Sequence, residues 1–524
     1  MRNSIPSVAM AGAAFVGACA LAGTALGAEP EGTLTVAVIQ ENQSMQAQMI
    51  FKEVNAVGLR NVIESLTMIN PVTGELDPVL ATSWEPVDEE TWRFRLREGV
   101  TFHDGSPFNA ESAAFLVNWV WDPANRFGIR EANAGEAITA EVVDEYSIDV
   151  RNSRGPDPIL PHRLYLAGIT SMEQIQNDLE NVDRIPVGTG PYRFSDWATG
   201  QYWEAEADPD WWGREADEPV GVHGEQLFER LRFVFRPETA VRAAMLQSGE
   251  VDIAMFLAPD QCVQADANAA TQCLVVASDT YIWMRPDFHG AHPALEDARV
   301  REAMFVAIDM PAIVEHLVVQ GVHQNGQMLP DAAVGHVPGL EAYAYDPERA
   351  RQLLDEAQAD GVDVDGLTLH IAARVGSSPR NGEVIEAIAN FLNEVGLSTT
   401  VALEEPAVFN QWLVAEPDAS RANVAVHPAN FGIMDYELTL GAGYTCASQL
   451  SVYCNPEFDE ALNAAARLSG EERHAALQEV VRFLHGEFVM APVALMQRAY
   501  GLPADLTWEP GLDHRVQVIN MTRD

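Results

Sequence analysis

The sequence predicts an α/β fold divided over two or three domains, and three observations lead to this prediction. The chain has 524 residues, which is more than one ordinary hydrophobic core encloses. Apolar residues make up 47% of the chain and charged residues 21%, which is a globular composition. Segments with the period of a strand and segments with the period of a helix alternate along the chain, as they do in α/β and α+β proteins.

The N-terminus has the features of a secretory signal peptide covering residues 1–28. Arg2 is the only charged residue in this segment, an apolar run spans residues 8–26, and the small residues at 25–28 suit cleavage by signal peptidase. Two alternatives are an N-terminal membrane anchor and lipoprotein processing at Cys19. The sequence therefore predicts a protein that leaves the cytoplasm.

Four cysteines follow the predicted signal peptide, in two close pairs. Cys262 lies near Cys273, and Cys446 lies near Cys454. An even number of cysteines in an exported chain favours disulfide bonds. Three pairings can be drawn, and we predict the two local bridges because they are the simplest. The rival interpretation, a zinc site made of four cysteines, needs a C-x2-C spacing that the sequence lacks.

Individual elements are predicted in chain order from periodicity and capping residues. The predicted strands comprise residues 33–39, 92–97, 231–235 and 251–255. The predicted helices comprise residues 107–120, 237–248, 346–357 and 471–485. Short strand-like segments follow residue 491.

The clearest unit of the chain is a predicted βαβ crossover. Residues 367–373 alternate as a strand, apolar residues recur at helical spacing over 384–395, and 397–403 forms the return strand. Such a crossover places its two strands parallel. Ligands bind beyond the carboxyl ends of strands in sheets of this kind. The loop that carries Arg380 therefore lies at a plausible place for a site.

The charge of the chain excludes one class of function. Acidic residues number 77 against 32 basic ones, which gives a formal charge of −45. A surface this negative repels nucleic acids and anionic lipid, so we expect no nucleic-acid partner. Lys52 is the only lysine, and an acidic surface poor in lysine suits a salty habitat, where screening removes self-repulsion.

The sequence carries no recognisable catalytic signature. It has no G-x-S-x-G elbow, no P-loop and no H-E-x-x-H motif. The segment 188–191 resembles a phosphate loop, but Pro191 removes a backbone N–H, so we predict a rigid turn before a strand at 192–194. We predict no catalytic residue, no cofactor and no metal, and hence a binding protein rather than an enzyme. The alternative from another class is a secreted hydrolase with an unrecognised site.

Five segments in order resemble one family, the extracytoplasmic solute-binding proteins of dipeptide, oligopeptide and nickel ABC importers (family 5). The strongest reads Leu96-Arg-Glu-Gly-Val-Thr-Phe-His-Asp-Gly-Ser-Pro-Phe-Asn-Ala-Glu111, and the second reads Pro186-Val-Gly-Thr-Gly-Pro-Tyr-Arg-Phe194. The other three segments are residues 78–84, 295–309 and 345–354. We expect the two strongest motifs to shape turns rather than to contact ligand.

The resemblance implies a two-lobed periplasmic binding protein fold, of class II and of the large type with an extra domain. Two hinge strands near 277–286 and 487–493 would join the lobes, and the ligand would be buried in the cleft between them. The implied domain boundaries are residues 29–66, 188–283 and 489–524 for a discontinuous domain I, 67–187 for domain II and 284–488 for domain III.

The resemblance also suggests where a ligand binds. In peptide binders of this family, an aspartate in an Asp-Tyr-x-Asp-Pro segment of domain III commonly pairs with the peptide α-amine. This chain keeps the first two residues as Asp435 and Tyr436 and lacks the second Asp and the Pro. Asp435 is thus a candidate anchor for a cationic group, and Arg380 is a candidate partner for a carboxylate. The candidate walls of the pocket are Tyr436, Phe431, Asn430, Trp412 and Trp283.

The family implies a periplasmic receptor that captures a small solute and delivers it to the permease of an ABC importer. We predict a peptide as the solute, with a nickel chelate, a sugar, an opine or another amine as alternatives. We expect a monomer.

Overall fold

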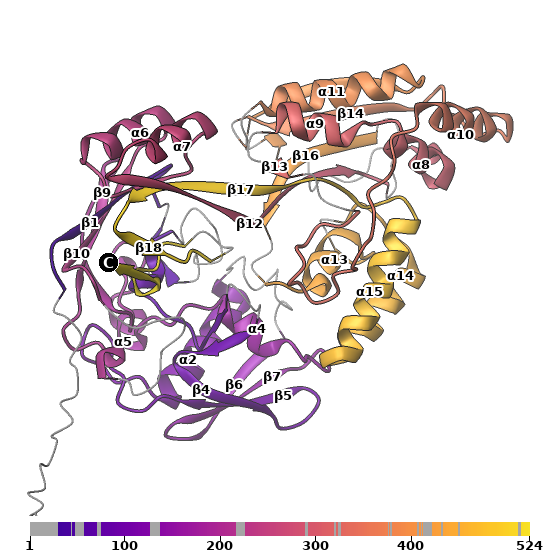
Figure 1. Cartoon of the computed structure of the whole chain (residues 1–524). Coiled ribbons are helices and arrows are strands. Elements are labelled where there is room, and N and C mark those ends of the chain that lie inside the picture. The colour runs from indigo at the N-terminus through magenta and orange to yellow at the C-terminus, as the bar shows by residue number, and fades with distance from the viewer. Residues whose placement is uncertain are drawn as a thin grey trace, which may run out of the picture.

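The computed structural model describes most of the chain after the predicted signal peptide. The described residues are 30–42, 44–47, 57–70, 75–125, 137–215, 226–288, 292–318, 321–322, 326–375, 377, 380–405, 408–409, 411, 422–430, 433–448, 451–511 and 515–523. They form two lobes (Figure 1). In these ranges no helix is long and apolar enough to cross a bilayer. The predicted signal peptide, residues 1–28, lies outside them.

One sheet of eleven strands runs through both lobes. Its order is β15-β14-β16-β12-β17-β11-β1-β10-β9-β8, and β13 pairs with β17 off this path. The bounds are β1 Thr33–Val38, β8 Tyr192–Ala198, β9 Tyr202–Ala207, β10 Arg230–Phe235, β11 Ile253–Met255, β12 Thr271–Pro286, β13 Gly321–Val322, β14 Thr368–Arg374, β15 Ser398–Glu404, β16 Ala422–Asn430 and β17 Ala491–Pro503. The strands predicted at 33–39, 231–235 and 251–255 are confirmed as β1, β10 and β11.

The predicted βαβ crossover is confirmed in the second lobe. The α11 helix (Asn381–Glu394) connects β14 to β15, and the two strands are parallel, with Leu369 opposite Thr399. Val384, Ile385 and Ile388 are buried on one face of α11. Their helical spacing brings them onto one stripe, which packs on the sheet.

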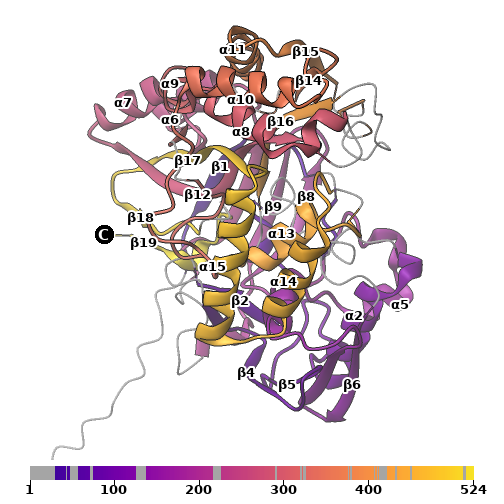
Figure 2. The same cartoon turned by 90° about the vertical axis from the view of Figure 1, so that its right-hand side faces the viewer.

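The remaining helices of the second lobe share a single apolar core with β12, β14, β16 and β17. They are α8 Ala298–Val306, α9 Met310–Leu317, α10 Pro347–Ala359, α13 Tyr436–Tyr444, α14 Pro456–Ala466 and α15 Gly470–Gly486. The α14 and α15 helices lie side by side (Figure 2). The predicted start of α10 is confirmed, because the Asp346 carboxylate accepts a hydrogen bond from the Arg349 N–H at 2.8 Å.

The first lobe holds two main cores. One lies around β1, β8–β10 and the C-terminal strands, and the other lies under a separate antiparallel sheet of order β4-β5-β7-β6. The helix predicted at 107–120 is confirmed as α2. The elements are β2 Thr67–Ile69, β3 Leu76–Pro78, β4 Ala81–Pro86, β5 Thr91–Leu96, α2 Ala110–Trp121, β6 Ile138–Asp144, β7 Ser147–Asn152, α4 Leu160–Tyr165, α5 Met172–Asn177, α6 Thr239–Ser248, α7 Pro259–Asp266, β18 Leu506–Trp508 and β19 Met521–Arg523. Short 3-10 helices cover Leu59–Asn61, Pro123–Asn125, Leu179–Asn181, Trp212–Glu215, Pro293–Glu296 and Val518–Asn520.

The two strongest family-like motifs contact each other within the first lobe. The His103 N–H donates to the Gly188 carbonyl at 2.9 Å, and His103 Nε2 lies 2.9 Å from the Gly190 carbonyl. A Cβ on Gly188 would lie 2.1 Å from the Val62 carbonyl oxygen, so no side chain fits there. The rigid turn predicted before 192–194 is confirmed, and it leads into β8.

A buried carboxylate lies under the same turn. Glu64 accepts hydrogen bonds from the Thr189 hydroxyl at 2.8 Å and from Trp212 Nε1 at 3.0 Å. Burial raises the pKa of Glu64 to about 7, because it outweighs the opposing effect of these hydrogen bonds and of Arg97. Glu64 is therefore the group in this region that titrates near neutral pH.

Both predicted disulfide bonds are confirmed. Cys262 is bonded to Cys273 with their Cα atoms 5.3 Å apart, and Cys446 is bonded to Cys454 with their Cα atoms 4.4 Å apart. Each bridge closes a short loop, one in each lobe.

Candidate functional site

The lobes are joined by β12 and β17, which form one antiparallel pair. Thr271–Ala277 pairs with Gln497–Pro503 in the first lobe, where β17 also pairs with β11. Tyr281–Met284 pairs with Ala491–Leu495 in the second lobe. The strands therefore pass from one lobe to the other, which confirms the two predicted hinge strands.

The pairing of β12 with β17 is interrupted where the strands change lobes. The register shifts between Ala277 and Tyr281, and within this interruption the Thr280 N–H donates to the Ser278 hydroxyl at 2.8 Å. A local break in a ladder allows the strand to bend. The β17 residue opposite the break is Met496, a few positions beyond the predicted 487–493. The resemblance implied this hinge near 487–493, and a second register shift, between Ile282 and Trp283, falls opposite Val493.

Trp283 and Asn430, two of the predicted wall residues, lie next to this break on adjacent strands. Asn430 pairs with Thr280, and Trp283 pairs with His427. Only the backbone of Asn430 is described. The Trp283 ring is buried, and its centroid lies 5.7 Å from that of Tyr444 on α13. Trp283 thus packs in the core of the second lobe, directly beside the hinge.

A polar and aromatic cluster that the sequence interpretation missed surrounds Trp283. Arg285 lies over the Trp283 ring at 5.6 Å, and His427 lies 6.0 Å from it between ring centroids. Burial lowers the pKa of His427 to about 4, so this imidazole is neutral at pH 7. The signal in the sequence was the alternation of Tyr281, Trp283 and Arg285, which places all three on one face of β12.

Asp435 and Tyr436 both have partners inside the second lobe. Asp435 is the N-cap of α13, and its two oxygens accept hydrogen bonds from Arg473 at 3.0 Å each. The Tyr436 hydroxyl accepts from the backbone N–H groups of Met328 and Leu329, at 3.1 Å and 2.9 Å. Both side chains are buried. In this conformation Asp435 presents no free carboxylate, and its predicted role as a ligand anchor stays a prediction.

Of the other three predicted residues, only Arg380 is described. Arg380 is exposed at the start of α11, where its Nε donates to Glu383 at 2.9 Å and its Nη1 donates to the His316 carbonyl at 2.7 Å. This is a surface ion pair. Phe431 and Trp412 lie outside the described residues.

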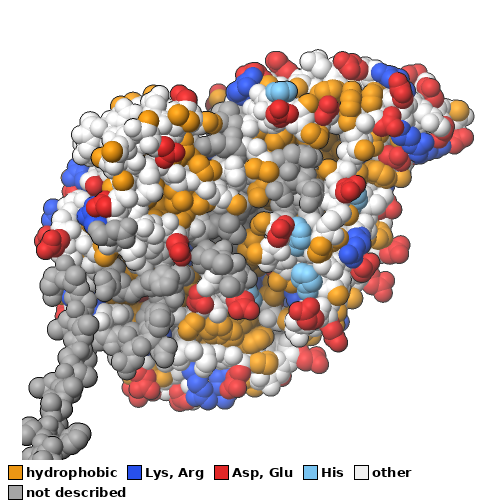
Figure 3. Space-filling view, in the orientation of Figure 1, with side chains coloured by type: hydrophobic (Ala, Val, Ile, Leu, Met, Phe, Trp, Pro, Cys, Tyr) orange, Lys and Arg blue, Asp and Glu red, His pale blue; other side chains and the backbone are white. Residues whose placement is uncertain are grey.

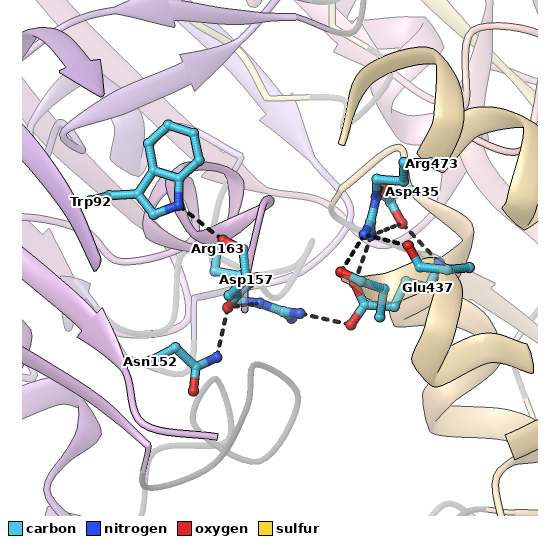
Figure 4. A network of polar contacts seen from close by, with 9 residues as sticks. Trp92, Asn152, Asp157, Arg163, Asp435, Glu437 and Arg473 are labelled. Atoms are coloured by element: carbon cyan, nitrogen blue, oxygen red, sulfur yellow. Dashed lines mark hydrogen bonds and ion pairs between the residues drawn. The ribbon is translucent and has the colours of Figure 1, made fainter. Parts of the chain in front are cut away.

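A buried ionic network connects the lobes opposite the hinge (Figure 4). Glu437, in the first turn of α13, accepts from Arg163 Nη2 at 2.9 Å and from Arg473 Nη2 at 2.6 Å. Arg163 belongs to α4 in the first lobe, whereas Arg473 belongs to α15 in the second. The two arginines hold the pKa of Glu437 below its usual value although burial acts to raise it. Glu437 is thus an ionised carboxylate between two cations.

Each arginine of this network also has an acidic partner in its own lobe. Arg163 Nε donates to Asp157 at 2.9 Å, and Asp157 in turn accepts from the Asn152 amide at 2.7 Å. Arg473 has Asp435. His162, the neighbour of Arg163, adds no charge, because burial and the two nearby arginines lower its pKa to about 4.

An apolar contact accompanies the ionic network. Ile433, two residues before the N-cap of α13, is fully buried within the core beneath the antiparallel sheet of the first lobe, and Leu438 of α13 packs against the same core. The start of α13 is therefore inserted into the first lobe although α13 belongs to the second. None of these contacts was predicted from the sequence.

The described residues contain no group of three or more His, Cys, Asp or Glu side chains placed to hold a metal ion. Acidic side chains lie over both lobes on the face seen in Figure 3. What the arrangement offers is two lobes joined by a two-stranded hinge on one side and touching through α4 and α13 on the other.

Comparison with known proteins identifies the architecture. The family model described as bacterial extracellular solute-binding proteins, family 5 Middle, matches residues 75–432, which is more than half of the chain. The heme-binding protein A of Haemophilus influenzae is 26% identical over 448 residues, which cover 80% of this chain and 79% of that protein.

Two solved structures show the same fold. The ABC transporter-associated periplasmic binding protein DppA from Helicobacter pylori, in complex with the peptide STSA, matches with a TM-score of 0.74 at 20% identity and covers 94% of this chain and 98% of that chain. NikZ from Campylobacter jejuni, in complex with Ni(L-His), matches with a TM-score of 0.75 at 21% identity and covers 94% of this chain and 100% of that chain. The predicted two-lobed α/β fold is confirmed.

Proposed function

This chain belongs to the bacterial extracellular solute-binding proteins of family 5, and we propose that it captures a small solute by closing its two lobes around it. The observation that carries this proposal is the hinge. A single sheet continues from lobe to lobe through β12 and β17, and the ladder between them breaks at Ser278–Thr280. Rotation about a few residues at such a break opens and closes a cleft without unfolding either lobe.

We propose that the solute is a peptide. Four residues would help to wall its site: Trp283, Asn430, Phe431 and Trp412. Arg380 is a candidate partner for the carboxylate of the peptide. The similarity to DppA in complex with the peptide STSA supports the peptide. The position of Trp283 and Asn430 beside the hinge supports the site, because ligand sites of two-lobed proteins lie where the lobes meet. In this proposal Asp435 and Tyr436 act by stabilising the start of α13, and Asp435 would bind an ammonium group only after releasing Arg473.

A second candidate is a solute that presents no free α-ammonium group, such as a nickel chelate, a sugar or an opine. A non-peptide amine, like a peptide, could pair with Asp435 only after Arg473 is released. The observation that favours the second candidate is the pairing of Asp435 with Arg473, since the carboxylate expected to anchor an amine is already bonded. The similarity to heme-binding protein A and to NikZ in complex with Ni(L-His) is compatible with it.

We further propose that the protein is a monomeric periplasmic receptor that delivers its solute to the permease of an ABC importer and catalyses no reaction. The three main cores support a division into three domains, although residues 281–283 and 489–496, which the expected boundaries assign to domain I, lie in the core of the second lobe. The cleaved segment would be residues 1–28.

Native mass spectrometry of the purified protein, followed by denaturation to release and identify any bound small molecule, tests this function. The proposal expects a bound solute that raises the melting temperature when it is added back, and no turnover of peptide or glycoside panels. Steady hydrolysis of a peptide or glycoside would contradict the receptor function and support the alternative of a secreted hydrolase. A released metal chelate or opine would favour the second candidate over the peptide.

A further inference from the structure

Among the described residues, the Arg163–Glu437 ion pair is a charged contact that joins the lobes directly. Arg163 is 6% exposed and Glu437 is 19% exposed, so this contact is largely shielded from water. Ion pairs that are shielded in this way are screened little by salt, in contrast to exposed ones. The contact is therefore expected to persist at physiological ionic strength when the lobes are this close.

The arrangement of charges makes this contact reversible. If the lobes separate, Arg163 keeps Asp157 in the first lobe, and Arg473 keeps Asp435 and Glu437 in the second. No buried cation is left without an anion. Breaking a buried pair is costly when it strands one charge, and here neither arginine is stranded. The two half-networks are each complete, and Glu437 is the group that links them.

Within the described ranges, the apolar part of the contact is centred on one inserted side chain. Ile433 leaves the second lobe and is buried in a core of the first, with Leu438 packed beside it. Asn430, three residues earlier, pairs with Thr280 at the hinge break. Asn430 and Glu437 both belong to the second lobe, so a rotation at the hinge would move Glu437 relative to the first lobe.

We propose that Ile433 and Glu437 form a latch that docks on Arg163 of α4 and holds the lobes together, independently of which solute is bound. The hinge permits opening, and the latch sets the ratio of closed to open protein in the absence of solute. A solute that binds both lobes then shifts the equilibrium between open and closed protein further toward the closed form, which the latch already favours. The latch rests on the two-lobed architecture and not on the identity of the solute.

The test measures opening without solute, through the reactivity of one introduced thiol. The four cysteines after the signal peptide are paired in disulfides, so Ile433→Cys supplies one free thiol at the latch. Cysteine is a small apolar residue that keeps this buried position apolar, and the Arg163–Glu437 pair, which the variants test, stays in place. The thiol's rate of reaction with a maleimide reports how often the lobes separate. We expect Glu437→Gln in this background to raise the labelling rate at least about tenfold, because it removes the charge that pairs with Arg163.

Two controls separate opening from unfolding. Glu383→Gln removes an exposed ion pair of the same lobe, with Arg380, and should leave the labelling rate unchanged. Ala303→Cys, a buried probe in the core of the second lobe, reacts only when that lobe unfolds, so Glu437→Gln should not accelerate it. Equal acceleration of both probes would mean that Glu437→Gln destabilises the lobe, and would overturn the latch.

A second variant approaches the contact from the other lobe. Because Arg163 also pairs with the buried Asp157, Arg163→Met is made together with Asp157→Asn, which leaves no unpaired buried carboxylate in the first lobe. This first-lobe variant should accelerate labelling of Ile433→Cys by a similar factor, and adding Glu437→Gln should change the rate little further, because both remove the Arg163–Glu437 interaction. Unchanged labelling in the first-lobe variant and in Glu437→Gln, or full additivity of the two, would contradict the latch. None of these outcomes depends on finding the solute, so a failed latch and a failed receptor function remain distinguishable.

Discussion

Substituting Asp435 with asparagine separates a structural role of this residue from a role in binding. The substitution keeps the shape of the side chain and its ability to cap α13, because asparagine is as good an N-cap as aspartate. It removes the charge that faces Arg473. In the structure Arg473 is 3% exposed, and Asp435 supplies both acceptors on one edge of its guanidinium.

The expected loss follows from these contacts. Removing one partner of a buried ion pair costs about 3–5 kcal/mol when the other charge is left alone. Here Glu437 stays on Arg473, and the asparagine oxygen still accepts one hydrogen bond. We therefore expect a loss below this range, about 2–3 kcal/mol of unfolding free energy. For a unit of the size of the second lobe, this corresponds to a melting temperature lower by roughly 4–12 °C.

Thermal and urea unfolding of the solute-free protein measure the effect, and Asp346→Asn is the matched control. Asp346 also caps a helix, α10, but it is exposed and accepts from the Arg349 backbone rather than from a buried guanidinium. We expect Asp346→Asn to unfold within about 0.5 kcal/mol of the unchanged protein. If Asp435→Asn is as stable as Asp346→Asn and has lost solute binding, the structural role is refuted and Asp435 is a ligand anchor.

Three further predictions concern the chain as a whole. Burial raises the pKa of Glu64 to about 7, and the unfolded-state value is near 4.5, so its contribution to stability is full below about pH 4.5 and disappears as pH rises through 7. The unfolding free energy of the unchanged protein should therefore fall by about 2–3 kcal/mol relative to that of Glu64→Gln from pH 5 to pH 8. If the unfolding free energies of the two proteins change with pH in parallel, the raised pKa is contradicted. Peptide mapping without reductant should recover Cys262 linked to Cys273 and Cys446 linked to Cys454, and reduction should cost about 2–3 kcal/mol for each bridge; free thiols at these positions would count against both. The formal charge of −45 predicts a melting temperature that rises from 0.05 to 1 M NaCl, because salt screens the self-repulsion; a falling value in calorimetry would show that attractive ion pairs dominate instead.

The elements that the sequence predicted are those whose pattern is local. The βαβ unit from Thr368 to Glu404 could be read because apolar residues on α11 repeat with the helical period and both strands lie next to it in the chain. Pro347 after Asp346 marked the start of α10 for the same reason. Periodicity and caps belong to short windows, so they are visible without knowing what packs against them.

Partners far apart in the sequence could not be predicted in this way. The pairing of Cys273 with Gly501 across β12 and β17 and the insertion of Ile433 into the other lobe depend on topology. A period states which face of an element is buried and not what covers it. The break at Ser278–Thr280 is also a property of two strands together, so no local pattern in β12 or in β17 marks its position.

In the candidate site, too, local patterns could be predicted from the sequence, whereas partners far apart in the chain could not. Asp435 was singled out because of its neighbour Tyr436, but its partner Arg473 lies on a different helix, and no local pattern connects them. A buried aspartate reads the same in sequence whether a ligand or an arginine faces it. Resemblance to a family suggested Trp283 and Asn430, which lie beside the hinge break, as wall residues, and their role stays a prediction. The interactions of individual side chains could be described only from the contacts.

Small-angle scattering during titration with the solute recovered from the purified protein tests most directly whether this chain captures solute by lobe closure. The measurement compares the radius of gyration of the solute-free and the saturated protein. Capture between lobes joined by β12 and β17 predicts a smaller radius of gyration at saturation, with a midpoint at the dissociation constant found by calorimetry. A radius that stays constant while calorimetry shows full occupancy would contradict closure.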